Sequence, residues 1–535
     1  MNPTETHNLV GKPAGDHPSD SDHPRPLPTS TKTDDTHNPL LNMILQPLRW
    51  LQMLSSQVTP TFVAGVVLVY GLNQGFSGSF FRVVSDYYWK DVQRVQPSAV
   101  QLYAGLYSIP WVMKPLWGLL TDVFPVRGYR RRPYFILSGV VGTLSALAVA
   151  LEGGMTVAAA LACLIGLSAA VAIADVTIDA CIARNSIEIR ALASDLQSLC
   201  GFCSSAGALV GYATSGFFVH HLGSQGAFGL LAVPPASLVL LGFFIYEHKT
   251  PSSGNSEKKL SSSVNAVPKW LNAVPKWLLA VEKVGVAMKG MYTTIKFPQV
   301  WKPSLYMYLS LALSISTHEG EFYWYTDPKA GPAFSQEFVG IIYAIGAMAS
   351  MAGVLIYHKT LKDYPFRNIL FLAQLLYGVS GMIDLCFILR WNLALGIPDY
   401  LFVVMEECVH RIVSRIRWMP MIVLSSRLCP LGIEGTFFAL LMCIDSLGGL
   451  SSKWGGGMML HLFHVTRTDF ANLWLVVLIR NVLRFSTLAF IFLVPKAGAS
   501  DVLIPPDLLT KNPTDKDGED ENLELVPLRV EKTLV

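Results

Sequence analysis

The chain has 535 residues, of which 51% are hydrophobic and only 15% are charged. Soluble proteins carry about 25% charged residues, so a chain of several soluble domains is excluded. The net charge of +3 is too small to indicate a nucleic-acid-binding protein. A membrane protein with many spans is the class that remains, since twelve helices of about 20 residues would use about 240 residues.

Polar segments divide the chain into five parts. Residues 1–56 and 495–535 are expected to be disordered cytoplasmic tails, the second of them acidic. Residues 57–246 and 300–494 are expected to form two halves of six helices each, joined by a cytoplasmic loop at 247–299. The N-terminal tail has neither the apolar core of a signal peptide nor the arginine-rich, acid-poor composition of a transit peptide.

Twelve apolar segments follow one another between the tails. They lie near 60–81, 102–120, 134–151, 157–181, 196–219, 227–246, 303–317, 338–356, 369–389, 400–424, 436–460 and 472–494. In lipid, backbone polar groups must be paired within the segment, which requires helices. The predicted fold is therefore an all-α membrane protein, a bundle of twelve transmembrane helices in two pseudo-symmetric six-helix halves.

The distribution of lysine and arginine predicts the orientation. With both termini inside, the inner segments hold 27 of these residues and the outer loops hold 6. Cytoplasmic loops carry the excess of positive charge. Both termini are therefore expected on the cytoplasmic side.

Two further sequence features predict no activity. All eight cysteines lie in or beside apolar segments, so we expect packing rather than a disulfide framework, including the C-x-x-C at Cys200 and Cys203. The central loop repeats NAVPKWL at 265–271 and 272–278. Either Trp270 and Trp277 rest on the membrane surface, or the repeat is a duplication in a tolerant linker, which is the favoured interpretation.

A cytoplasmic gate is predicted at the loop between the second and third helices. There a glycine that permits close helix contact, an aspartate at the helix end and a basic cluster resemble the loop signature of the major facilitator superfamily. Acidic residues stand at the starts of helices five and eleven. The predicted gate residues are Gly118, Asp122, Arg130, Arg131, Arg132, Asp195 and Glu434. The alternative is that the arginines only anchor the topology.

Ionisable residues inside the spans indicate function, because each costs about 2.5–3.5 kcal/mol at a helix centre. In helix four, AIADVTIDACIA places Asp175 and Asp179 four residues apart, so they share one face. A single acid near the helix end could be a snorkelling residue, but a pair favours a functional role.

Helix ten holds six ionisable groups in residues 400–418, which would cost about 15–20 kcal/mol if they faced lipid. Glu407, Arg411 and Arg415 form a stripe that can pair internally, and Glu406 can pair with His410. The helix must face a wet cavity or a polar partner helix. The alternative is a self-satisfied ladder of ion pairs between helices.

Other spans add Asp384 in helix nine, and Asp445 and Lys453 in helix eleven. Tyr103 and Tyr107 share a face of helix two that could line a cavity. The candidates for substrate binding or proton coupling are Asp175, Asp179, Arg411, Arg415, Glu406, Glu407, Asp384, Asp445, Tyr103 and Tyr107. No catalytic residue, metal site or cofactor is predicted.

Several long blocks are similar to the folate–biopterin transporter family in its plant-type form. They include YGLNQGFSGSFFRVVSDYYWKDVQRVQPS (70–98), IPWVMKPLWGLLTDVFPVRGYRRRPYFIL (109–137), HEGEFYWYTD (318–327) and RWMPMIVLSSRLCPLGIEGTFFALLMCID (417–445). The resemblance covers about 57–495. It implies the major facilitator fold and the transport of folates, biopterin or related pterins, with proton coupling for several members.

The resemblance assigns roles to the buried charges. A carboxylate can take the amino–amide edge of a pterin with paired hydrogen bonds, and arginine suits the two carboxylates of folate's glutamate tail. We hypothesise that Asp175 or Asp179 binds this edge or carries the coupling proton, while Arg411 and Arg415 hold the tail. The expected partners are the folate or pterin substrate, protons and the lipid bilayer, and the expected state is a monomer.

Two other functions compete with this hypothesis. The D-x-x-x-D of helix four resembles the metal-binding aspartates of membrane prenyltransferases, but the second acidic cluster that those enzymes need is missing, so an enzyme is not expected. A carrier for another organic anion shares every physical feature above. The plasma membrane, the vacuole and the plastid envelope all stay open as locations.

Overall fold

The computed structural model describes residues 49–124, 126–188, 193–245, 247, 295–362, 364–427 and 434–496. They fall in two units, Met1–Ser55 and Ser56–Val535. All helices named below belong to the second unit, which is described by itself. Most of both predicted tails, and the NAVPKWL repeat of the central loop, lie outside the described residues.

The first helix runs unbroken from Pro60 to Val92, with a proline at its first position, where no N–H donor is needed. Its segments are α2 (Pro60–Val66), the π-helix η1 (Val67–Ser77), α3 (Gly78–Tyr87) and the π-turn η2 (Tyr88–Val92). The apolar segment predicted here ended at residue 81, which is wrong by three turns. Charged Arg82 and Asp86 lower the local hydropathy, although the chain stays helical through them.

The rest of the N-terminal half is helical as well. Its helices are α4 (Pro97–Leu106), α5 (Ile109–Val112), α6 (Lys114–Val123), α7 (Arg132–Leu151), α8 (Val157–Glu188), α9 (Ala193–Leu230) and α10 (Val233–Phe244). Gly223 has φ +71°, which only glycine adopts at little cost, and it kinks α9. The predicted boundary between helices five and six lies at this kink.

The C-terminal half begins with a broken helix. α13 (Pro298–Ala312) ends early, and α14 (His318–Tyr325) starts after a short non-helical stretch, so the predicted segment 303–317 covers only part of the seventh helix. The remaining elements are α15 (Gln336–Ile356), η5 (Tyr357–Leu361), α16 (Phe366–Ile388), α17 (Trp391–Ala394), α18 (Asp399–Arg427), α19 (Glu434–Leu462), α20 (Leu473–Ser486) and the 3-10 helix η6 (Thr487–Leu493).

Within the described residues, six helical stretches are long and apolar enough to cross a membrane. They are Arg132–Leu151, Val157–Ile182, Ser198–Phe244, Gln336–Leu361, Phe366–Ile388 and Leu473–Leu493. One of them, Ser198–Phe244, spans two of the predicted segments. A multi-pass, all-α membrane architecture is confirmed, and the count of twelve crossings stays a prediction.

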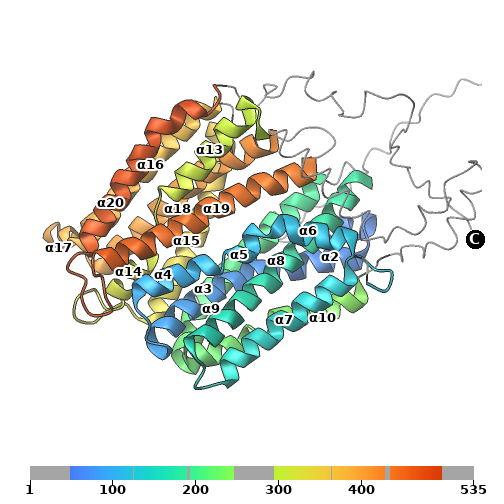
Figure 1. Ribbon diagram of the computed structural model, residues 1–535, viewed down its shortest axis with the longest axis horizontal. Helices are drawn as coiled ribbons and strands as arrows, with labels where there is room; N and C mark the ends of the chain where they lie inside the picture. The colour runs from blue at the N-terminus through green and yellow to red at the C-terminus, as the bar shows by residue number, and fades with distance from the viewer. Residues whose placement is uncertain are drawn as a thin grey trace, which may run out of the picture. The chain divides into compact units, whose positions relative to one another are not determined.

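The two halves repeat the same helix contacts. In the N-terminal half α9 packs on η1 and α3, α10 on α7, and α8 on both α7 and α6. Moving six helices along the chain gives the matching pairs: α19 on α13, α20 on α16, and α18 on both α16 and α15. Figure 1 shows the blue-to-green helices gathered together and the yellow-to-red helices gathered together. The arrangement is that of two pseudo-symmetric halves.

Among the contacts between the halves, those of α9 with α15 and of α4 with α19 are the most extensive, and these two pairs are also related by the six-helix shift. Glycines allow both to approach closely. A Cβ on Gly457 of α19 would lie 2.9 Å from the Ser98 carbonyl oxygen, and one on Gly340 of α15 would lie 2.9 Å from that of Tyr212. Small residues at helix crossings are typical of membrane bundles.

Candidate functional site: a polar cavity between the halves

A cavity of about 400 Å³ lies between the two halves. Its walls come from the first, second, fourth, seventh and eleventh helices. Five charged or titratable side chains line it: Arg82, Asp86, His318, Glu319 and Lys453. The first two lie on α3 and the next two on α14, so the cavity brings together residues more than 200 positions apart.

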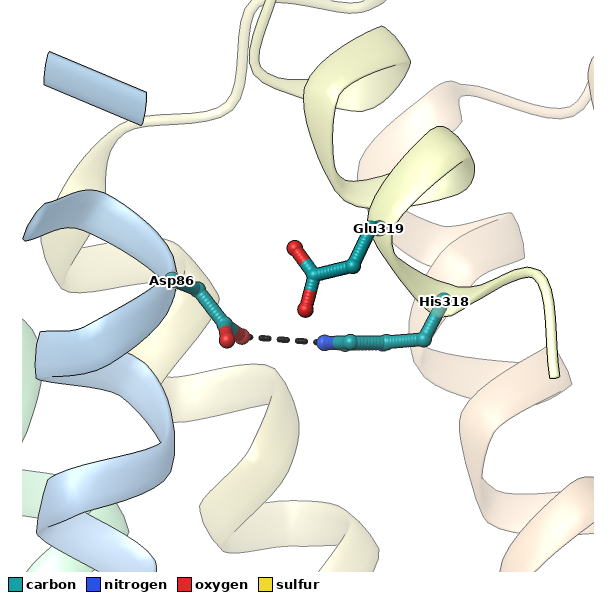
Figure 2. Close-up of side chains that lie close together, drawn as sticks. All are labelled: Asp86, His318 and Glu319. Carbon is teal, nitrogen blue, oxygen red and sulfur yellow. Dashed lines mark hydrogen bonds and ion pairs between the residues drawn. The ribbon is translucent and has the colours of Figure 1, made fainter. Parts of the chain in front are cut away.

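The acidic side of the cavity joins α3 to α14 (Figure 2). His318 Nε2 lies 2.9 Å from Asp86 Oδ2, and the ligand atoms of Asp86, His318 and Glu319 all lie within 4.8 Å of one another. The Glu319 backbone N–H donates to Gln101 Oε1 at 3.1 Å. Glu319 Oε2 is buried and has no hydrogen-bond partner among the described residues.

The two cations of the cavity are not paired with these carboxylates. Lys453 Nζ donates to the Ala104 carbonyl oxygen at 3.2 Å and to Ser108 Oγ at 2.7 Å. Arg82 is partly buried, and its guanidinium carbon lies 5.8 Å from the centre of the Tyr343 ring. Across the described ranges the Arg82 guanidinium has no ion pair or hydrogen bond, so its donors are available to a ligand.

Aromatic side chains form another wall of the cavity, where Phe81, Trp89, Tyr107 and Trp111 line it. Trp89 Nε1–H donates to the Tyr107 hydroxyl, and the Tyr103 ring packs on Trp89 at 5.2 Å between centroids. Of the two tyrosines predicted to line a cavity, Tyr107 does so. Tyr103 is not among the lining residues and instead packs against the ring of Trp89, which is.

Free donors, free acceptors and flat apolar faces together suit one kind of ligand. The Arg82 guanidinium and the Lys453 ammonium can bind anionic groups. The Asp86 and Glu319 carboxylates can accept from an amino–amide edge, and the aromatic rings offer faces for stacking. The cavity therefore fits a flat heteroaromatic molecule that carries negative charge.

The predicted aspartates of helix four lie next to this cavity rather than in its lining. Asp175 is buried in an ion pair with Lys114 of α6. Asp179 is exposed and accepts from the Tyr70 hydroxyl of η1. Lys114 Nζ lies 4.6 Å from the Trp111 ring centre, so a chain of contacts connects Asp175 to the cavity wall.

The charged stripe of helix ten faces α15. Arg411 Nε lies 2.6 Å from Glu407 Oε1, which is the pairing that the i, i+4 spacing predicts. Arg415 Nε donates to Ser350 Oγ at 2.9 Å. None of these residues is among those that line the cavity.

A polar network links four helices of the C-terminal half. Arg480 of α20 pairs with Glu321 of α14 and, at 2.5 Å, with Asp384 of α16. The ligand atoms of Asp384, Glu406 and His410 lie within 4.8 Å of one another. These contacts are of the kind expected from the alternative for helix ten, a ladder of ion pairs between helices. Asp445 of α19 is partly buried and does not line the cavity.

At the predicted gate, the third helix is capped by a residue that sequence reasoning missed. The Glu247 carboxylate accepts from the backbone N–H groups of Arg130 at 2.7 Å and of Arg131 and Arg132 at 3.0 Å. A carboxylate at a helix N-terminus is stabilised by the helix dipole. The Arg131 side chain donates to Thr121 Oγ1 at 2.6 Å, which adds a structural role to its predicted ones.

The other gate residues are placed as follows. A Cβ on Gly118 would meet Val176 at an ordinary 3.5 Å, so no close contact requires this glycine here, contrary to expectation. Asp195 lies in the first turn of α9 and Glu434 begins α19, as predicted. The side chains of Asp122 and Glu434 lie outside what the structure describes.

Four cavity residues were missed from the sequence because they stand just beyond the predicted apolar segments. Arg82 and Asp86 follow 60–81, and His318 and Glu319 follow 303–317. One signal could have found the first two: they are four residues apart, so they share a helix face. Their nearness to the second two depends on the packing of α3 against α14.

Comparisons with known proteins agree with this geometry. The model of the BT1 family matches residues 74–510. The chain is 64% identical to the probable folate-biopterin transporter 6 of Arabidopsis thaliana, over 92% of this chain and 93% of that protein. It is 30% identical to the folate-biopterin transporter of Synechocystis, over 77% and 78% of the two chains.

Among solved structures the chain resembles the nucleoside transporter NupG. The TM-score is 0.58 at 14% identity, and the match covers 80% of this chain and 98% of that one. At this identity the likeness concerns the fold, which is that of a transporter with two helical halves.

Proposed function

Because this chain belongs to the BT1 family, we propose that it moves folates or pterins across a membrane by alternating access of its two halves. It is a multi-pass membrane transporter and not an enzyme. Its relatives are named folate-biopterin transporters, and the chemistry of the cavity supports the same class of substrate.

The observation that carries this proposal is the unpaired guanidinium of Arg82 beside Lys453 in an aromatic cavity. Folate offers a flat pterin ring for Trp89 and Trp111 and a glutamate tail for the two cations. The amino–amide edge of the ring would face Asp86 or Glu319. We therefore propose a substrate site among the first, second, seventh and eleventh helices, in preference to one at Arg411 and Arg415.

Alternating access requires that one end of the bundle be closed. Near the ends of α3 and α14 the halves are joined by Lys90 with Thr326 and by the Tyr323 hydroxyl, which donates to the Val95 carbonyl oxygen at 3.0 Å. The Arg467 backbone N–H donates to Gln96 Oε1 at 3.0 Å close by. The charge distribution makes this the outer end, so we propose a state closed to the outside.

Proton coupling, a monomeric state and cytoplasmic termini are parts of the same proposal. Asp175 and Asp179 follow the lining residues of α8 in the chain, and we propose that they line the cytoplasmic part of the path. A fluorescent protein fused to the full chain would show which membrane holds the transporter: the plasma membrane, the vacuole or the plastid envelope.

Uptake into vesicles tests the proposed function. Purified protein reconstituted into liposomes should take up labelled folate saturably, unlabelled biopterin should compete, and an inward proton gradient should raise the uptake. Protein-free liposomes are the control. Uptake of other organic anions without any folate or biopterin uptake would instead support the rival carrier.

A further inference from the structure

Two buried carboxylates from different halves face each other in the cavity. Asp86 of α3 is 5% exposed and Glu319 of α14 is 3% exposed. Their oxygens lie within 4.8 Å of each other and of a His318 ring nitrogen. Two carboxylates this close in a dry site repel each other unless a positive charge lies between or beside them.

The partners of the two carboxylates are unequal. Asp86 Oδ2 has the His318 ring nitrogen at 2.9 Å. Glu319 Oε2 is buried without a partner among the described residues, and Figure 2 shows its carboxylate pointing into the space beside the Asp86–His318 bond. Leaving a buried acceptor unsatisfied costs about 1–3 kcal/mol, and more when it is charged. A proton on Glu319 would turn this acceptor into a donor and remove the repulsion between the two carboxylates.

The fixed cations Arg82 and Lys453 lie in the same cavity and act on Glu319 only at longer range. Arg82 and Asp86 from α3, Tyr107 from α4, Lys453 from α19 and His318 from α14 all line the same cavity as Glu319. Neither Arg82 nor Lys453 forms an ion pair with Glu319 or Asp86 within the described residues, and Lys453 is held by Ala104 and Ser108.

We propose that Glu319, with Asp86 and His318, holds the coupling proton of this transporter; the proposal rests on the transport function proposed above. A hydronium ion on one side gives its proton to a Glu319 carboxylate oxygen: one O–H bond of the hydronium breaks as the O–H bond of the acid forms, and a water molecule is left. The neutral acid then donates to Asp86. Release of the same proton to water on the other side completes the cycle.

The position of the cluster couples the proton to the movement of the halves. Asp86 belongs to the N-terminal half and His318 and Glu319 to the C-terminal half, so separating α3 from α14 breaks the Asp86–His318 bond and admits water to Glu319. Asp175 and Asp179 differ in this respect. Their partners Lys114 and Tyr70 belong to their own half, so opening between the halves leaves those contacts intact.

Transport by the reconstituted full chain separates the two assignments. In E319Q, whatever its basal rate of folate uptake, a proton gradient should no longer raise that uptake, so the ratio of uptake with the gradient to uptake without it should fall to one. D179N should still accumulate folate. E152Q, which changes an exposed carboxylate, is the matched control for the amide substitution.

The outcomes distinguish this inference from the proposed function. If the unmodified protein neither accumulates nor exchanges folate, the proposed function fails. If E319Q accumulates folate as the unmodified protein does, if D179N alone abolishes accumulation, or if sodium replaces protons as the driving ion, the proton site is not at Glu319.

A spectroscopic test needs no substrate and no transport. Infrared difference spectra of the reconstituted protein between alkaline and acidic pH should contain the carbonyl stretch of a protonated carboxylic acid. Other carboxyl groups of the chain contribute to this region as well, so the band of Glu319 is the component that is missing in E319Q and kept in E152Q and D179N. A band that persists unchanged in E319Q would overturn the proposal, even if that variant transports nothing.

Discussion

Arginines in this protein differ in whether the fold already satisfies them. Arg411 is paired with Glu407, and Arg480 with Glu321 and Asp384. Arg82 lines the cavity, and its guanidinium has no ion pair or hydrogen bond in the described part of the chain. An arginine that the protein leaves unpaired is available for a substrate anion, whereas removing a paired one leaves the charge of its buried partner uncompensated, which is destabilising.

We therefore expect R82Q to discriminate between substrates. Loss of a charge-assisted hydrogen bond of about 1.5–3 kcal/mol should weaken folate binding by about tenfold or more. Biopterin, which has no glutamate tail, should be affected much less. Inhibition constants for both compounds, measured in the same vesicles, provide the comparison.

R411Q is the matched variant. Because Arg411 is held by Glu407, its loss should lower the melting temperature and leave the ratio of folate to biopterin affinity unchanged. If the ratio of folate to biopterin affinity changed in R411Q and stayed constant in R82Q, the anion site would lie on helix ten and not in the cavity.

Lys114, unlike Arg82, is paired within the fold: its ammonium group forms an ion pair with the buried carboxylate of Asp175. Asp175 is 1% exposed, so removing its partner leaves a buried charge, which costs about 3–5 kcal/mol. K114M should therefore lower the melting temperature of the purified protein clearly, and K114M/D175N should recover part of the loss. A double variant less stable than K114M would mean that the two residues are not paired.

Among the elements, α19 shows how helix contact controls the joint between the halves. Gly457 faces α4, where an added Cβ would lie 2.9 Å from both Leu102 Cγ and the Ser98 carbonyl oxygen. Gly449 lies on the same helix with nothing within 4 Å of such a Cβ. Substitution by alanine is therefore expected to have opposite effects on stability at Gly457 and at Gly449.

We expect G457A to destabilise the protein by about 1–3 kcal/mol, the usual cost of overpacking, and to slow transport because the joint between the halves no longer closes. G449A should be neutral or stabilising by up to about 1 kcal/mol, since alanine favours helix over glycine. Melting temperatures and folate uptake rates measure both. Equal effects of the two substitutions would rule out close packing as the reason for Gly457.

For the whole molecule, the repeated helix contacts and the charge distribution describe one transporter plan. The main contacts within the N-terminal half have counterparts six helices later, and so do the contacts of α9 with α15 and of α4 with α19 between the halves. The excess of lysine and arginine, 27 inside against 6 outside, predicts which end of this bundle faces the cytoplasm.

Labelling of introduced cysteines tests that orientation. A membrane-impermeant thiol reagent should label E152C in sealed cells and S262C only after permeabilisation, because the first is predicted to lie outside and the second in the cytoplasmic loop. The unmodified chain, with its eight cysteines, gives the background. Labelling of S262C in sealed cells would reverse the topology.

The sequence by itself determined the membrane class, the helical fold, its division into halves and the family, because hydropathy and charge act along the chain and long similar blocks are specific. It also indicated Tyr107 and the Glu407–Arg411 pair, whose spacing is local. The cavity was decided only by tertiary structure. Arg82, Asp86, His318 and Glu319 stand at the edges of two apolar segments more than 200 residues apart, and only the packing of α3 against α14 brings them together.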